Sequence, residues 1–287
     1  MQPLVDKSEY ERLKAPIQRV NGSQFGIFQK DAYLHPHKGW FEHKYHRFCD
    51  LLDKIEAAEG SLYDFSLGFK KLGFNETEDG VWFREWAPGA KEVYLIGDFN
   101  NWDRKQHPLK KDQYGNWEIF IPKNPDGSYP IPHNSKLKIH LLNANNEWVD
   151  KIPAWIPYAV QNPTTLAYDG VYISQQEEHR YKWKHPQPKA VRAPKIYETH
   201  IGMSSSEAKI ASYKEFTKDV LPRIKDLGYN TIQIMAIMEH SYYGSFGYHV
   251  TNFFAISSRY GEINDLKELI DTAHSMGIHV LIDLIHR

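Results

Sequence analysis

The sequence predicts an all-β region followed by a parallel α/β region, and three observations support this fold class. Between residues 65 and 181, short apolar or alternating runs are separated by turn clusters rich in Gly, Asn, Asp and Pro, a pattern typical of a β-sandwich. From residue 195 the pattern becomes strand, helix, strand, helix, strand, the order of a parallel α/β unit. The 287 residues leave room for about two domains, each with its own core.

A helix is predicted before the sandwich. Apolar side chains recur at spacings of four and three, so they share one helix face: Phe41, Tyr45, Phe48, Leu52 and Ile55. Gly60 is positioned to end this helix, and we take residues 1–60 as an N-terminal helical segment. His43 and His46 share a helix face, but no carboxylate or thiol completes a recognisable ligand set, so no metal site is predicted there.

The sandwich is assigned to residues 61–182, with strands expected at 93–96, 117–121 and 137–142. The stretch 180–194 carries three prolines and five Lys or Arg without one acid. This composition predicts an extended connection between domains, which we place at 183–194.

The α/β region is assigned to residues 195–287. Its strands are expected at 195–200, 231–235 and 279–285. Ser212 and Glu215 have the spacing of a capping box that starts the first helix.

Four residues set the expected limits and shape of the two helices in this region. Pro222 should remove one backbone hydrogen bond and bend the first helix, which Gly228 ends. Asn264 is the expected cap of the second helix, which ends at Gly277.

Composition excludes several classes of protein. Thirty-five Lys and Arg against 36 Asp and Glu give a net charge of −1, so neither a nucleic-acid nor a membrane-surface partner is predicted. One cysteine, Cys49, rules out an internal disulfide and a Cys-based zinc cluster. The longest apolar run spans residues 234–238, and the N-terminus lacks the apolar stretch of a secretory signal. We therefore expect a cytoplasmic protein.

Known motifs for cofactor and hydrolase chemistry are missing from the sequence. It holds neither GxxxxGK[ST] nor GxGxxG, and no GxSxG, HExxH or CxxC. No cofactor or metal is therefore predicted. Aromatic residues make up 14% of the chain, which suits a sugar-binding surface, although cores use them too.

Polar residues follow the predicted parallel strands, where sites lie in such folds. Glu198 and His200 close the first strand, and Asp283 and His286 close the third. A buried strand-end acid is costly unless it is paired or used, so Asp283 is a candidate for function or for an ion pair that organises the sheet edge.

The connection 235–261 is too long for an ordinary βα loop. It contains Tyr248 and Arg259. Tyr248 can serve either function or packing.

Four segments carry a family resemblance, in family order, within the part of the chain from about residue 41 onward. EWAPGAKEVYLIGDFNNW (85–102) resembles a carbohydrate-binding module of family 48, and KIYETHIGMSS (195–205) resembles the first barrel strand of the alpha-amylase superfamily. MAIMEHSYYGSFGYHVTNFFAISSRYG (235–261) is similar to the second-strand region of 1,4-alpha-glucan branching enzymes. LIDLIHR (281–287) resembles the start of the superfamily's first signature.

This resemblance implies the first three strands of a (β/α)8 TIM barrel, preceded by the sandwich. Branching enzymes cut an α-1,4 glucan and transfer the freed segment to a 6-hydroxyl, so the implied partners are glycogen, amylose and amylopectin. The implied mechanism is retaining, with a carboxylate nucleophile and a carboxylic acid/base.

The resemblance also implies roles for single residues. Tyr248 matches the tyrosine that stacks on the sugar at the cleavage point, and Asp283 matches the signature aspartate of that subsite. Arg259 matches a basic family position to which we assign no role. Trp102 matches the aromatic that contacts glucan in related modules, and Trp148 is a weaker match because the spacing around it departs. Either Trp can instead be core, and this alternative weighs more for Trp148.

The family's catalytic carboxylates follow the fourth, fifth and seventh strands, which these residues do not include. We therefore expect an N-terminal part of a branching enzyme that contains no catalytic residue and does not cleave or transfer glucan alone. Two alternatives are a non-catalytic glucan-binding isoform and an isoform without function.

Overall fold

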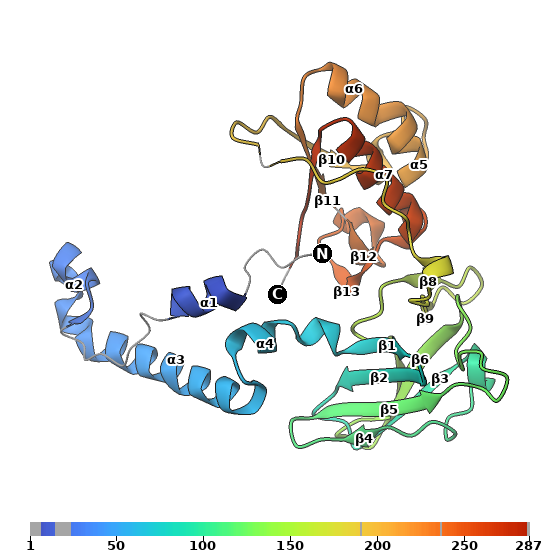
Figure 1. Cartoon of the computed structure of the whole chain (residues 1–287), viewed down its shortest axis with the longest axis horizontal. Helices are drawn as coiled ribbons and strands as arrows, with labels where there is room; N and C mark the ends of the chain where they lie inside the picture. The colour runs from blue at the N-terminus through green and yellow to red at the C-terminus, as the bar shows by residue number, and fades with distance from the viewer. Residues whose placement is uncertain (1–6, 15–23, 190, 236, 286–287) are drawn as a thin grey trace. The chain divides into compact units, whose positions relative to one another are not determined.

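The computed structural model describes residues 7–14, 24–189, 191–235 and 237–285, and the chain divides into two compact units, Met1–Lys70 and Lys71–Arg287. The first unit is helical (Figure 1). Its elements are α1 (Lys7–Lys14), α2 (Ile27–Lys30), the 3-10 helix η2 (Ala32–His37), α3 (Lys38–Glu59), α4 (Leu62–Ser66) and the 3-10 helix η3 (Gly68–Lys70).

Helix α3 confirms the helix predicted from the apolar spacing. Gly60 ends it with φ +88°, a left-handed value that glycine adopts without a steric penalty. Cys49 and Leu52 are buried, whereas Phe48 of the predicted apolar face is 45% exposed. The helical unit continues to Lys70 rather than to residue 60, because the Ser61 hydroxyl accepts from Asp64 N at 2.9 Å and starts α4.

The second unit begins with a β-sandwich, as predicted. One antiparallel sheet has the order β1 (Gly73–Thr77), β2 (Gly80–Trp86), β5 (Asn116–Pro122), β4 (Lys110–Lys111). The other has the order β3 (Glu92–Gly97), β6 (Lys136–Leu142), β9 (Tyr168–Val171), β8 (Ala159–Gln161), with β7 (Trp148–Lys151) also paired to β6. Their inward side chains form one core that includes Val81, Phe83, Leu95, Trp117 and Leu137.

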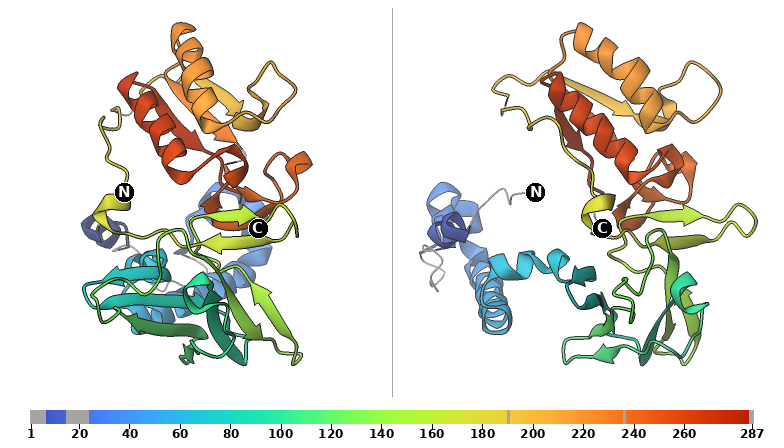
Figure 2. Two further views of the ribbon diagram at one scale, coloured as in Figure 1. Left: turned by 90° about the vertical axis from the view of Figure 1, so that its right-hand side faces the viewer. Right: turned by 45° about the vertical axis from the view of Figure 1, so that its right-hand side comes forward.

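The α/β region contains the predicted parallel sheet in the order β10 (Ile196–His200), β11 (Thr231–Met235), β14 (His279–Ile282). The helices α5 (Tyr213–Glu215), α6 (Leu221–Asp226) and α7 (Ile263–Ser275) lie on one side of this sheet (Figures 1 and 2). Ile232 and Ile234 point into their shared core and are fully buried. The opposite face is more open, because Ile196 and Leu281 are 44% and 43% exposed.

Two expectations for this region were wrong in detail. Helix α7 is capped by Glu262 rather than by Asn264 and begins at Ile263, because the Asp265 side chain accepts from Glu262 N at 3.1 Å. Strand β14 ends at Ile282, not at residue 285. The expected distortion at Pro222 is a π-helical turn: α5, η7 (Phe216–Val220) and α6 follow one another without a break, and η7 ends two residues before Pro222, which has no N–H to donate.

The long connection after β11 is more ordered than a loop. It holds an antiparallel hairpin of β12 (Met238–His240) and β13 (Val250–Ile256), followed by the 3-10 turn η9 (Ser258–Tyr260). Between the strands lies the 3-10 turn η8 (Tyr243–Ser245). The hairpin therefore gives the residues around Tyr248 a scaffold of their own.

Candidate functional site

The carboxyl ends of the parallel strands bring two acids to one amide. Glu198 of β10 and Gln233 of β11 are paired in register, so their side chains share one sheet face. Gln233 Nε2 donates to Asp283 Oδ1 at 2.7 Å and to Glu198 Oε1 at 3.4 Å. Asp283, just past β14, is half-buried, and its own N–H donates to Ile234 O at 3.1 Å. Asp283 is thus held in place by a neutral amide.

Tyr248 lies at the end of the turn that joins β12 to β13. Phe246 and Gly247 take left-handed conformations, with φ +53° and +83°, and Tyr248 N donates to Ser245 O at 3.1 Å. The side chain of Tyr248 is 44% exposed, so it is not a core residue. It lines a cavity of about 320 Å³ together with Ser241, Tyr242, His249, Val250, Thr251, Phe253 and Ile285.

This cavity joins the hairpin to the segment after β14. Ile285, two residues beyond Asp283, is one of its lining residues, whereas Asp283 is not. The fold therefore brings Tyr248 near the strand end that carries Asp283. The link between them is Ile285, because Asp283 itself does not line the cavity. His286, the other strand-end residue named from the sequence, lies outside the described residues.

Arg259 stabilises the turn that carries Tyr248, a role that the sequence did not indicate. Its guanidinium donates to His240 O and to Ser241 O, both at 3.1 Å, and to the Tyr168 hydroxyl at 3.5 Å. It also lies over the Tyr243 ring, 5.4 Å from the centroid. Arg259 therefore fixes the start of the turn that carries Tyr248 and links it to β9 of the sandwich.

The sandwich supports the hairpin at further points. Tyr158 OH donates to Gly261 O at 3.2 Å, Ile256 N donates to Pro157 O at 3.4 Å, and the Trp155 and Phe254 rings stack 5.7 Å apart. Burial, together with the charges of Glu262 and Glu239, raises the pKa of Tyr158 to about 12, so its hydroxyl stays a donor. This support was not foreseen from the sequence, because strands β8 and β9 were not predicted individually.

Other strand-end polar residues are part of the framework. Glu239 is fully buried and accepts from His240 N, Ser258 N and Ser258 Oγ at 3.0, 2.8 and 2.6 Å. Burial, and then the neighbouring His240, lower the pKa of His200, which is therefore neutral at pH 7. These groups stabilise the hairpin rather than face an open cavity.

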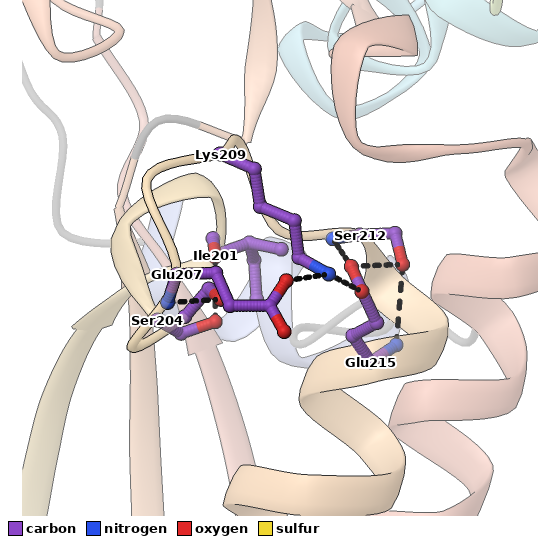
Figure 3. A network of polar contacts seen from close by, with 7 residues as sticks. Ile201, Ser204, Glu207, Lys209, Ser212 and Glu215 are labelled. Atoms are coloured by element: carbon purple, nitrogen blue, oxygen red, sulfur yellow. Dashed lines mark hydrogen bonds and ion pairs between the residues drawn. The ribbon is translucent and has the colours of Figure 1, made fainter.

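A polar network fixes the loop between β10 and α5 (Figure 3). Glu215 accepts from Ser212 N at 2.8 Å while Ser212 Oγ accepts from Glu215 N at 3.2 Å, which confirms the predicted capping box. Lys209 reaches Glu207 at 2.8 Å and Glu215 at 2.7 Å. The Lys209 ammonium, followed by the bonds from Ser212, lowers the pKa of Glu215 to about 2.

Trp102 lies in a tightly bonded turn of the sandwich. The turn places Trp102 at φ +61°, and its N–H donates to Gly97 O at 2.8 Å while its Nε1 donates to Asp98 Oδ1 at 2.9 Å. The buried Asn100 side chain holds the same turn by accepting from Gly97 N at 3.0 Å. Trp102 is half-buried with its polar edge satisfied, so its ring is not part of the core.

Trp148, at the start of β7, is also a surface residue, being 47% exposed. Its ring stacks on His140 with centroids 4.5 Å apart and planes 8° apart. His140 Nδ1 lies 2.6 Å from Asp150 Oδ1, and Arg104 binds the other oxygen of Asp150 at 2.9 Å. Burial alone would raise the pKa of Asp150, but the bonds from His140 and Arg104 outweigh it and lower the pKa. The core alternative therefore does not hold for Trp148 either.

The described residues contain no group of three or more His, Cys, Asp or Glu arranged to hold a metal ion. Within the same residues, no helix has the length and apolar character needed to cross a membrane.

Comparison with known proteins places this geometry in context. Residues 71–156 match the family "Carbohydrate-binding module 48 (Isoamylase N-terminal domain)", and residues 217–287 match "Alpha amylase, catalytic domain". Among solved structures, the fold resembles a putative alpha amylase from Salmonella typhimurium (TM-score 0.59, 20% identity, 75% of this chain and 33% of that one). It also resembles a pullulanase type I from Bacillus subtilis complexed with maltose (TM-score 0.58, 20% identity, 74% and 32%).

Curated proteins show much higher identity. The 1,4-alpha-glucan-branching enzyme of Solanum tuberosum is 52% identical over 275 residues, 95% of this chain and 32% of that protein. The enzymes of Dictyostelium discoideum and Equus caballus are 48% and 46% identical over 91% and 96% of this chain, and 38% and 41% of their own lengths. The chain thus spans roughly a third to two fifths of these relatives. The similarity to 1,4-alpha-glucan-branching enzymes, at about 50% identity, thus runs through nearly all of the residues of this chain.

Proposed function

We propose that this protein acts in 1,4-alpha-glucan branching, the transfer of an α-1,4-linked glucan segment to a 6-hydroxyl. The observation that carries this proposal is the identity of about 50% to branching enzymes over 91–96% of the chain. Glycogen, amylose and amylopectin are the proposed substrates, and solved relatives of the same fold include a pullulanase complexed with maltotetraose.

Within this function we propose that Tyr248 and Asp283 contribute to one sugar subsite. Three features support this: the exposed Tyr248 ring, the shared cavity with Ile285, and the fixed carboxylate of Asp283. An aromatic face covers the apolar side of a glucose ring, while a carboxylate accepts hydrogen bonds from its hydroxyls. Arg259 positions the Tyr248 turn.

We further propose that β10, β11 and β14 are the first three strands of a (β/α)8 barrel. Their parallel order and the helices on one face support this. The nucleophile and acid/base implied by the resemblance follow later strands, so the 287 residues alone are expected to bind glucan without turnover. A non-catalytic glucan-binding isoform is the second candidate, favoured by the half-buried Trp102 and the 47% exposed Trp148 on the sandwich. A cytoplasmic location remains our proposal.

Two assays test these proposals. Incubation of amylose with the 287-residue chain should leave iodine staining unchanged, and a fall in stain would contradict the proposed lack of turnover. Co-sedimentation with glycogen should retain the chain, and Trp102→Ala or Trp148→Ala should each weaken binding by about tenfold. Leu227→Ala is the matched control, because Leu227 is 71% exposed and lies outside these sites. Binding that is absent, or equal in all variants, would contradict the assignment.

A further inference from the structure

An aromatic surface on the first sheet of the sandwich is not used by any site described above. We define the Trp86 face as the outward side chains of β2 and β5 around Trp86: Trp82, Arg84, Trp86, Glu118 and Phe120. Alternation along β2 buries Val81, Phe83 and Glu85 and leaves the other three side chains outward. The Trp102 and Trp148 sites belong to the other sheet and its turns.

The residues of this face are paired across the two strands. Trp82 lies opposite Phe120, with ring centroids 5.1 Å apart, and Arg84 lies opposite Glu118, with a 3.0 Å ion pair. The Arg84 guanidinium also covers the Trp82 ring at 4.5 Å. The face therefore has an aromatic pair at one end, an ion pair in the middle, and Trp86 at the other end, about 13 Å from Trp82 along the strand.

Trp86 is the exposed and rigid end of this face. Its side chain is 56% exposed, yet its Nε1 is occupied, because it donates to Tyr114 O at 3.2 Å. The turn next to Trp86 is tightly packed, and Ala87 N donates to Gly115 O at 3.0 Å. Gly115 has φ +86°, and a Cβ at this position would lie only 2.6 Å from Pro88, so only glycine fits here. The indole is therefore held in a fixed position with its polar edge satisfied and its rings open to a ligand.

The charges on the face point to a neutral, hydroxyl-rich ligand. Glu118 forms a 3.0 Å ion pair with Arg84 and also lies opposite the exposed Lys110 of β4, while the nearby Lys111 ammonium is bound by Pro88 O at 2.7 Å and Ala90 O at 2.9 Å. The centre of the face therefore carries one acid between two bases, and this small net charge does not by itself select a polyanion or a polycation. A sugar chain, in contrast, offers apolar ring faces to Trp86 and hydroxyls to the polar edges of Arg84 and Glu118.

We propose that the Trp86 face is a second glucan-binding surface, which holds a linear α-1,4 glucan on the sheet that does not carry Trp102 and Trp148. This inference rests on the proposed function, since it takes the same polymer as ligand. Two surfaces on one module would bind a branched polymer more tightly than either surface alone.

Fluorine NMR of the chain labelled with fluorotryptophan tests this proposal directly, with maltoheptaose as the probe. The eight Trp residues give separate signals that Trp→Phe variants assign. The Trp86 signal should shift saturably, while those of Trp40 and Trp183, which are 55% and 52% exposed, should not. Shifts at Trp102 or Trp148 without one at Trp86 would overturn this inference and leave the proposed function standing. No shift at any Trp would overturn both.

A second measurement uses affinity electrophoresis in gels containing amylose. Trp86→Ala should weaken the affinity by about five- to tenfold, whereas Trp86→Phe, which keeps a ring, should stay within about twofold of the parent chain. Trp40→Ala is the matched control for loss of an exposed Trp. Equal affinity of Trp86→Ala and the parent chain, or an equal loss with Trp40→Ala, would overturn the proposal.

Discussion

Gln233 donates a 2.7 Å hydrogen bond to Asp283, from the middle strand of the parallel sheet to the residue just past its third strand. The same amide lies 3.4 Å from Glu198. A neutral donor thus separates two acids that would otherwise repel one another at the strand ends. Within the part of the chain that the structure describes, the Asp283 carboxylate is therefore held by a neutral amide and not by an ion pair.

Gln233→Glu is expected to destabilise the fold in a pH-dependent manner. A third carboxylate beside Glu198 and Asp283 should lower the free energy of unfolding by about 2 kcal/mol at pH 7. The matched variant Gln233→Met loses only the hydrogen bonds and should cost about 1 kcal/mol at every pH. Urea denaturation at pH 7 and pH 4.5 measures the difference in unfolding free energy between Gln233→Glu and Gln233→Met. This difference should be smaller at pH 4.5, because a carboxyl group takes up a proton there. A difference that does not change with pH would contradict the assigned role of Gln233.

Arg259→Met should loosen the turn that carries Tyr248. The variant loses the donors to His240 O and Ser241 O and should lower the free energy of unfolding by about 2–3 kcal/mol. Arg259→Lys should restore only part of this, because an ammonium does not reproduce the planar fork of the guanidinium.

Hydrogen exchange locates the effect of the Arg259 variants. Amides of residues 241–249 should exchange faster in both variants, and most in Arg259→Met. The exposed Arg192 provides the control, since Arg192→Met should change stability by no more than about 0.5 kcal/mol. Unchanged exchange in residues 241–249 would show that Arg259 does not position Tyr248.

The sequence predicted the elements whose signals are local. Gly60 ends α3 and the Ser212–Glu215 box starts α5 as expected, because a left-handed glycine and a reciprocal cap depend only on near neighbours. The hairpin β12–β13 escaped prediction, because its short first strand, Met238–His240, and its irregular register give no clear alternation. Asn is a residue type that often caps helices, which is why Asn264 was expected to do so. Glu262 caps α7 instead, because the Asp265 side chain accepts a hydrogen bond from Glu262 N.

Some of the candidate site residues could likewise be predicted from local sequence, whereas others could be found only in the structure. Tyr248 and Asp283 could be named from their positions after strands and from the resemblance, whereas the task of Arg259 depends on carbonyls 18 and 19 residues away and on a sandwich tyrosine. Trp86 was not singled out, because an outward Trp in an alternating strand looks the same in sequence as an inward one. Its significance appears only when its indole N–H is seen bonded to the Tyr114 carbonyl.

Asp271 is expected to fasten the connecting segment to α7. Although 2% exposed, it accepts from Tyr181 OH, Lys184 N and His185 N at 3.0, 3.0 and 2.9 Å. Asp271→Asn replaces one acceptor oxygen by a donor and should lower the free energy of unfolding by about 1–3 kcal/mol at pH 7. Glu268→Gln, an exposed change on the same helix, should have almost no effect. Proteolysis kinetics at Lys182 and Lys184 measure the release of the segment, and equal cleavage rates in both variants would contradict the expectation.

Glu85 should make the sandwich less stable as the pH rises. It is 2% exposed and accepts from Trp86 N and Ala154 N, and burial raises its pKa to about 7 even though both bonds act in the opposite direction. Between about pH 4.5 and pH 7 the unfolded chain has lost the proton that the folded chain retains, so the unfolded state binds fewer protons and the free energy of unfolding falls with pH. The loss due to this group is about 3 kcal/mol at most.

The variant Glu85→Gln isolates this contribution from all other titrating groups. The Gln amide cannot ionise. Its NH2 group would face one of the two backbone N–H donors and could not accept from it, so the variant should lower the free energy of unfolding by about 1–3 kcal/mol at every pH. The stability advantage of the parent chain over Glu85→Gln should therefore be largest near pH 4.5 and shrink by pH 7.5, as followed by urea denaturation in steps of pH. Glu118→Gln, on the exposed face of β5, should show no such trend. An advantage of the parent chain that grows with pH would mean that Glu85 is ionised in the folded sandwich and is stabilised by its two backbone donors.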